Sequence, residues 1–125
     1  AFVQSKLGGL PNVSLRGPIH GLPAYLSSFD YLLMPSVFEG LSIMSLEASM
    51  EALPVIANSC PGLRDTLPDD WALKVNGNSI DAYMHIFNDI VAKEDKDKLG
   101  SIARDFAAAK FGVRQMQTSY EKVYG

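Results

Sequence analysis

Two glutamates, Glu39 and Glu47, flank the place where an apolar run ends and a helical pattern begins. Ser42 lies between them and is suited to cap the helix. The first amides of a helix have no partner within it, so they attract an anion, phosphate above all. Carboxylates would repel that phosphate, so both glutamates are better interpreted as acceptors for hydroxyl groups of the same ligand. A nucleoside diphosphate sugar, with a diphosphate between two hydroxylated rings, has this chemistry.

The glycine beside the first glutamate, Gly40, permits close approach of a ligand to the backbone, or a positive φ angle. Two glutamates eight positions apart are common by chance. On spacing alone, a solvated loop carboxylate at Glu39 and an exposed helix glutamate at Glu47 are equally good interpretations. The surrounding residues must decide between them.

The elements that position these residues begin with short apolar runs, which are typical of buried parallel strands. Such runs occupy residues 13–15, 31–34, 55–57 and 72–75. Loop residues follow the first three runs directly, at 16–22, 35–42 and 58–63. Open parallel sheets bind ligands at the carboxyl ends of their strands, so a ligand is expected at these three loops.

Apolar residues at helical spacing predict five helices. They span Leu22 to Phe29, Ile43 to Leu53, Ile80 to Val91, Leu99 to Phe106 and Val113 to Val123. We interpret the apolar stripe of each as a face packed in the core. In the second helix that face comprises Ile43, Leu46, Met50 and Leu53. Alternating strands and helices predict an α/β fold, a Rossmann-like open parallel sheet flanked by helices, in one domain over residues 1–125.

Composition narrows the classes of function. The net charge of −3 argues against a protein whose main partner is a phosphate backbone, so no nucleic-acid partner is expected. The single cysteine, Cys60, has no partner for a disulfide, and no signal sequence opens the chain, which favours a cytoplasmic location. No apolar run approaches the roughly 18 residues of a membrane span. Any membrane contact of the full protein is therefore expected to be peripheral, at the inner face.

The residues around the two glutamates agree with one known pattern over nearly the whole chain. The agreement lies in Pro35-Ser36, Phe38 to Ile43, Leu46 to Ala48, Leu53 to Asn58, Val13-x-Leu15-x-Gly17, Phe29-Asp30 and Tyr120 to Tyr124. Together these segments resemble the group 1 glycosyltransferases, glycosyltransferase family 4, which have the GT-B fold and a Glu-x7-Glu signature. The combined pattern is far more specific than either glutamate alone.

The resemblance implies a retaining transfer of a sugar from a nucleoside diphosphate sugar, with no bound metal and no further cofactor. It implies that Glu39 contacts hydroxyls of the transferred sugar and acts catalytically, by orienting the donor and supporting a developing oxocarbenium ion. Glu47 would contact the ribose. The backbone would supply the remaining contacts, with the diphosphate at Gly40, Leu41, Ser42 and Ile43, and with the base at Pro18 and Ile19, beside Leu46.

This chain departs from the family pattern at two positions where glycine is usual, Ala52 and Ser42. A complete member also has an N-terminal acceptor domain, and an Arg and a Lys that grip the diphosphate. Lys6 and Arg16 do not match that pair. We therefore expect the C-terminal donor half of a longer enzyme, incomplete at its start and inactive alone. The acceptor would be a glycan or a lipid-linked glycan, in polysaccharide or glycoconjugate synthesis.

Two other functions remain open at this point. A nucleotide-sugar 2-epimerase of the GT-B fold shares the donor, although its carboxylates and histidines are placed differently. A non-catalytic flavodoxin-like binding module, such as a receiver domain, needs an aspartate at the end of a central strand, whereas Asp30 stands before one. His20, His85 and Cys60 lack partners at catalytic or metal-ligand spacing, so no metal site is expected.

Overall fold

Three short parallel strands form the sheet at the centre of the computed structural model, which describes residues 2–124. The strands are β1 (Leu32–Met34), β2 (Val55–Asn58) and β3 (Lys74–Val75), in the order β1-β2-β3. Leu32 is paired with Val55, and Asn58 with Val75. All of β2 is buried, as expected for a central parallel strand. The predicted Rossmann-like α/β class, a parallel sheet flanked by helices, is confirmed.

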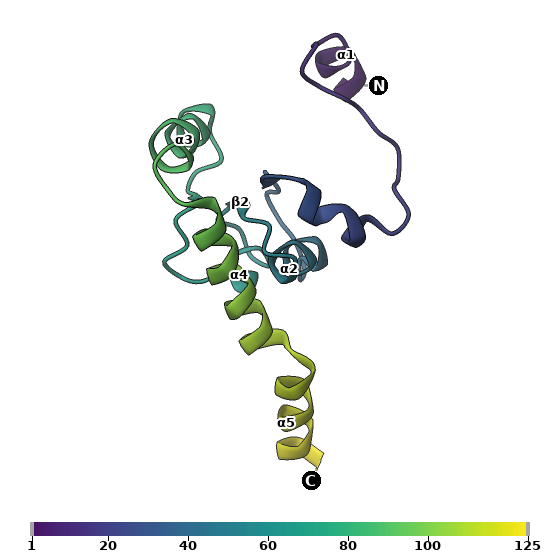
Figure 1. Ribbon diagram of the computed structural model, residues 1–125, viewed down its shortest axis with the longest axis vertical. Helices are drawn as coiled ribbons and strands as arrows, with labels where there is room; N and C mark the ends of the chain where they lie inside the picture. The colour runs from purple at the N-terminus through teal and green to yellow at the C-terminus, as the bar shows by residue number, and fades with distance from the viewer. Residues whose placement is uncertain (1, 125) are drawn as a thin grey trace.

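Helical elements precede, separate and follow the strands. They are α1 (Phe2–Leu7), the 3-10 helices η1 (Leu22–Ser28) and η2 (Arg64–Thr66), α2 (Ile43–Met50), α3 (Ile80–His85), the π-helix η3 (Ile86–Val91), α4 (Lys96–Phe111) and α5 (Val113–Tyr124). Figure 1 shows α2 and α4 close to the sheet, while α1 and α5 project from the body at opposite ends of the molecule. The core surrounds β2 and includes Val55, Ile56, Leu63, Leu73 and Val75, each at most 1% exposed.

The expected strand at residues 13–15 is wrong for the described chain. This segment has no strand partner within residues 2–124, and Leu15 is 38% exposed. An apolar run becomes a strand only beside another strand that completes its hydrogen bonds. β1 is an edge strand of this sheet, and its Leu33 is 47% exposed.

The buried face of α2 also differs from the expected one. Ile43 and Met50 are 58% and 49% exposed, whereas Ser45, Ala48 and Ser49 are fully buried. The reason is that α2 packs against α4 at close range. A Cβ atom on Gly100 of α4 would collide with the carbonyl oxygen of the Ala52 residue that follows α2. The small residues on this face of α2 allow the two helices to come that close. Ile43 and Met50 therefore lie on other faces of α2, which are exposed.

The end of α2 explains why glycine suits position 52. The Leu53 amide donates to the Ala48 carbonyl at 2.9 Å, and the Ala52 amide donates to the Ser49 carbonyl at 3.0 Å. These two bonds form a Schellman motif, in which the residue after the cap adopts left-handed backbone. Ala52 does so with φ 56°, at a cost that glycine avoids.

Replacing Ala52 with glycine is therefore expected to raise the free energy of unfolding by about 1 kcal/mol. Thermal denaturation should show this as a rise in Tm. The matched control is Ala109→Gly in the exposed interior of α4, which is expected to lower stability by about the same amount because its backbone is helical. Equal losses from both changes would contradict the strain at Ala52.

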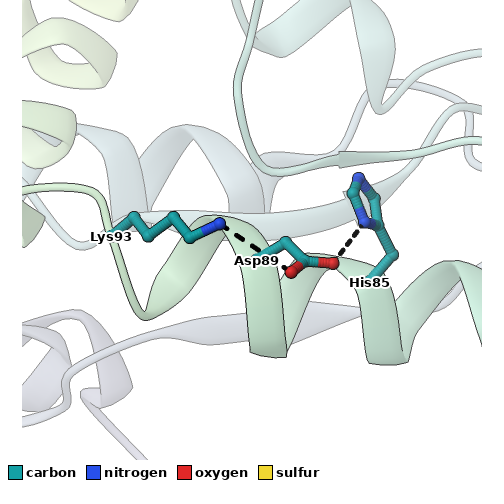
Figure 2. A network of polar contacts seen from close by, with 3 residues as sticks. All are labelled: His85, Asp89 and Lys93. Atoms are coloured by element: carbon teal, nitrogen blue, oxygen red, sulfur yellow. Dashed lines mark hydrogen bonds and ion pairs between the residues drawn. The ribbon is translucent and has the colours of Figure 1, made fainter.

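The predicted helix over Ile80 to Val91 forms, but its second half is π-helical. Ile86, where the wider turns begin, is buried, while Ile80 at the start of α3 is 81% exposed. His85, Asp89 and Lys93 form a polar network along its outer surface (Figure 2), with His85 Nδ1 2.8 Å and Lys93 Nζ 3.9 Å from the two Asp89 carboxylate oxygens. All three side chains are at least half exposed, so the network contributes little to stability.

The last predicted helix, α5, also forms, but its expected packing face is not buried. Val113, Met116, Tyr120 and Val123 are each more than half exposed. Within residues 2–124, α5 has no buried residue. The apolar residues of α5 therefore repeat at the helical period, but they are not part of the core of the described chain.

Candidate functional site

The loops that follow β1 and β2 meet at the carboxyl edge of the sheet, where the sequence predicts a ligand. The Glu39 amide donates to the carbonyl of Pro61 at 3.3 Å. Gly62 lies so close to this loop that a Cβ atom there would collide with the carbonyl oxygens of Glu39 and Gly40. Gly62 also has left-handed backbone, with φ 84°. The backbone of the first glutamate therefore rests directly on the loop after β2.

Two asparagines join this loop to the ends of the other strands. Asn58, at the end of β2, is 8% exposed and donates through Nδ2 to the Ser36 carbonyl at 2.8 Å. Asn78, beyond β3, donates to the Pro35 carbonyl at 3.2 Å and accepts from the Tyr83 hydroxyl at 2.5 Å. Burial and the neighbouring Cys60 raise the pKa of Tyr83, which keeps its hydroxyl a neutral donor. Hydrogen bonds thus connect the loops at the C-terminal ends of all three strands.

The side chain of Glu39 has a defined orientation at this edge. Its Oε1 atom accepts a hydrogen bond from the Ser36 hydroxyl at 2.8 Å, and both residues are half-buried. Within residues 2–124, Oε2 has no hydrogen-bond partner. One carboxylate oxygen is therefore held by the protein, and the other is free to accept a hydrogen bond from a ligand.

The start of α2 supplies the unpaired amides that the sequence predicts. The Ser42 hydroxyl accepts from the Ser45 amide at 3.2 Å, which confirms Ser42 as the cap. In the described part of the chain, the amides of Ile43 and Met44 have no hydrogen-bond partner. Ile43 is also 58% exposed, so this first turn is open to a ligand. It is a place where an anion is stabilised.

The backbone conformation at position 40 does not require a glycine. The φ of Gly40 is not among the positive values, which occur at Gly21, Gly62 and Gly77 among the described glycines. A Cβ atom on Gly40 would meet no atom within 4 Å. The glycine beside Glu39 thus leaves open space, and close approach of a ligand there stays a prediction. Leu41 beside it is 48% exposed.

Glu47 lines a cavity of about 340 Å³ between α2, η1 and the end of α4. The lining residues are Pro23, Leu46, Glu47, Met50, Glu51, Ala107, Phe111, Gly112 and Val113. Most of them are apolar, and Glu47 itself is half-buried. Leu46 and Met50, which the sequence predicts to be core residues, line this cavity instead. A ligand with an apolar ring and adjacent hydroxyl groups suits such a lining.

The residues predicted to lie along a base are placed elsewhere. Pro18 and Ile19 are exposed in the segment between residues 13–15 and η1. Ile19 lines a separate cavity of about 810 Å³ with Arg16, His20 and Tyr25. The structure thus brings Leu46 and Glu47 together in one cavity and Ile19 into another. The assignment of Pro18 and Ile19 to a base stays a prediction.

Three residues that shape the site have no assigned role in the sequence pattern: Ser36, Asn58 and Gly62. Ser36 precedes Glu39 by only three positions, so the sequence places both residues in one short loop. Asn58 directly follows a buried apolar run, where a polar side chain signals a strand end. No local signal distinguishes Gly62 from other loop glycines, because its need for a missing Cβ arises from a distant loop.

Residues 2–124 contain no group of three or more His, Cys, Asp or Glu residues arranged to hold a metal ion. Within the same residues, every helix is too short or too polar to serve as a membrane span. The expectation that no metal is needed stays a prediction.

Comparison with known proteins identifies a family and two relatives of this chain. The family described as "Glycosyl transferases group 1" matches residues 2–93, a range that includes both glutamates. An uncharacterized 41.2 kDa protein in the cps region of Klebsiella pneumoniae is 32% identical over 104 residues, which cover 82% of this chain and 29% of that protein. Sulfoquinovosyl transferase SQD2 of Arabidopsis thaliana is 30% identical over an alignment 130 residues long, which covers 94% of this chain and 25% of that protein.

No solved structure matches the chain significantly. The chain spans between a quarter and a third of the length of these two curated relatives. The family match covers well over half of the 125 residues, from α1 to the turn after η3. It includes the loop after β1, the capped start of α2 and the loop after β2. The chain therefore belongs to the group 1 glycosyl transferases.

Proposed function

We propose that the full-length protein containing this chain is a retaining glycosyltransferase that uses a nucleoside diphosphate sugar, and that this chain supplies the donor site. One observation carries the proposal: along the chain, the oriented carboxylate of Glu39 precedes the unpaired amides at the start of α2, and the cavity-lining carboxylate of Glu47 follows them. Two hydroxyl acceptors around an anion site match the order of groups in such a donor.

Each part of the donor has a place in this proposal. The diphosphate lies at the amides of Ile43 and Met44, where the helix terminus stabilises its charge. The ribose hydroxyls bind Glu47, and the apolar side of the nucleoside lies on Leu46. The transferred sugar binds Glu39. As the bond to the diphosphate lengthens, positive charge develops on the sugar ring, and the Glu39 carboxylate stabilises it.

The retained configuration, the absence of a metal requirement and the transfer of a hexosyl group belong to this proposal as well. So do an acceptor glycan or lipid-linked glycan, a cytoplasmic location at the inner face of a membrane, and a role in polysaccharide or glycoconjugate synthesis. The names of the two relatives, one encoded in a cps region and one a sulfoquinovosyl transferase, are compatible with this role.

Nucleotide binding tests the assignment of Glu47. In the full-length protein, Glu47→Gln is expected to raise the Kd of the matching nucleotide about 10- to 100-fold, the worth of a hydrogen bond to a charged group. Calorimetry with UDP, GDP and ADP identifies that nucleotide first. Glu94→Gln, on an exposed turn, is the matched control and should leave Kd unchanged. Unchanged affinity in Glu47→Gln would show that the ribose lies elsewhere.

Product analysis separates the proposal from the other two functions. A glycosyltransferase releases nucleoside diphosphate only as sugar appears on the acceptor. An epimerised nucleotide sugar, formed without acceptor, would instead identify a 2-epimerase. Covalent modification by a small phosphodonor would identify a receiver-like module.

A further inference from the structure

We propose that Ser36 is a positioning residue that holds the Glu39 carboxylate in the orientation required for sugar transfer, an inference that rests on the function proposed above. The Ser36 hydroxyl donates to Oε1 of Glu39 at 2.8 Å. Oε2 has no partner within residues 2–124. The bond therefore selects which carboxylate oxygen faces the ligand.

The position of Ser36 is set by distant parts of the chain, so the bond is more than a local turn. Asn58 donates to the Ser36 carbonyl at 2.8 Å from 22 residues away. Asn78 donates to the preceding Pro35 carbonyl at 3.2 Å from 43 residues away. The Asn58 side chain is almost fully buried, which leaves it little freedom to move. Two other strand ends thus fix the peptide that carries the Ser36 hydroxyl.

The backbone of Glu39 is fixed independently of its side chain. Its amide donates to the Pro61 carbonyl at 3.3 Å, and its carbonyl lies against Gly62. Three rotatable bonds nevertheless separate the glutamate backbone from its carboxylate. Ser36 is the described residue whose side chain restrains that carboxylate. Removing the Ser36 hydroxyl should therefore release the carboxylate without moving the loop.

Without the Ser36 hydroxyl, the Glu39 carboxylate can adopt several orientations and is in the required one only part of the time. Transition-state stabilisation depends on donors and charges that are already oriented when the reaction occurs. Misplacement of a reacting group by about 1 Å costs up to about 100-fold in rate. Nucleotide binding does not depend on Glu39 in the proposed arrangement, so the loss should fall on kcat and leave binding unchanged.

The test uses the full-length protein and a nucleotide-sugar transfer assay. Ser36→Ala is expected to lower kcat about 10- to 100-fold while KM for the donor changes less than about threefold. Ser36→Thr keeps the hydroxyl and should retain most of the activity. Thermal denaturation and nucleotide affinity should match the wild type. If Ser36→Ala does not fold, Ser36→Cys provides a side chain of similar size with a much weaker donor.

A double-variant cycle decides whether Ser36 acts through Glu39. In a Glu39→Ala background there is no carboxylate to position, so Ser36→Ala should cause no further loss of kcat. Additive losses, or wild-type kcat in Ser36→Ala, would overturn the inference and leave the proposed function standing. Failure of the wild-type protein to transfer sugar from any nucleotide donor would instead overturn the proposed function, and the inference with it.

Discussion

Glu39→Gln in the full-length protein is expected to lower kcat for sugar transfer about 100- to 1,000-fold, the usual cost of losing one oriented electrostatic group. Glutamine has nearly the same shape, and its carbonyl oxygen can still accept from Ser36. The substitution therefore keeps the position, removes the negative charge and puts an NH2 donor in place of the free Oε2 acceptor. Because the charge is needed when positive charge develops on the sugar, the larger loss should appear in kcat, with a smaller rise in KM for the donor from the lost acceptor.

Steady-state kinetics with a nucleotide sugar and an acceptor measure this effect. Glu121→Gln, on the exposed surface of α5, is the matched control and should leave kcat unchanged. Nucleotide affinity by calorimetry should be nearly the same in Glu39→Gln and the wild type. Wild-type kcat in Glu39→Gln would remove this residue from the catalytic role and place the chemistry elsewhere on the edge.

Gly62→Ala is expected to be the most damaging single substitution of a glycine at this site. Its Cβ atom would overlap two carbonyl oxygens, those of Glu39 and Gly40, and its φ of 84° opposes any side chain. Left-handed backbone costs about 1–2 kcal/mol, and forced overlap in a packed region adds about 1–3 kcal/mol. The free energy of unfolding should therefore fall by about 3 kcal/mol. Relief of the overlap would also move Glu39, so activity should fall too.

Gly77→Ala separates the two contributions. Gly77 also has left-handed backbone, with φ 95°, but a Cβ atom there would meet nothing within 4 Å. Denaturant unfolding of both variants should show the smaller loss for Gly77→Ala, and its kcat should stay close to that of the wild type. Equal losses of stability would mean that the loops do not press on each other at Gly62.

The alternation of β1, α2 and β2 and the start of α2 follow from the sequence alone, because their causes are local. Ser42 caps α2 through a bond to the amide three residues ahead, and Pro54 stands where the helix has already ended. The apolar run at residues 55–57, between Pro54 and Asn58, indicates the buried strand that forms as β2. These local signals predict Glu39 before the helix and Glu47 one turn inside it, which is where the structure has them.

Only the tertiary structure shows which neighbouring element covers each face of a helix. Periodicity finds the apolar stripe of α2, but the face that is buried is chosen by α4, where Gly100 permits close contact. Ile43 consequently lies open at the candidate phosphate site, and Leu46 lines a cavity beside Glu47. An apolar pattern records which side chains avoid water, and it does not record which surface will cover them.

The sequence by itself determined that two glutamates flank a capped helix start after a strand, since spacing and capping act over a few residues. The tertiary structure alone decided how the first of them is held. Asn58 and Asn78 reach the same loop from 22 and 43 residues away, and Gly62 excludes a side chain because another loop occupies that space. Such contacts depend on how strand ends converge in three dimensions. For that reason Glu39 is predictable as a residue, and its orientation is not.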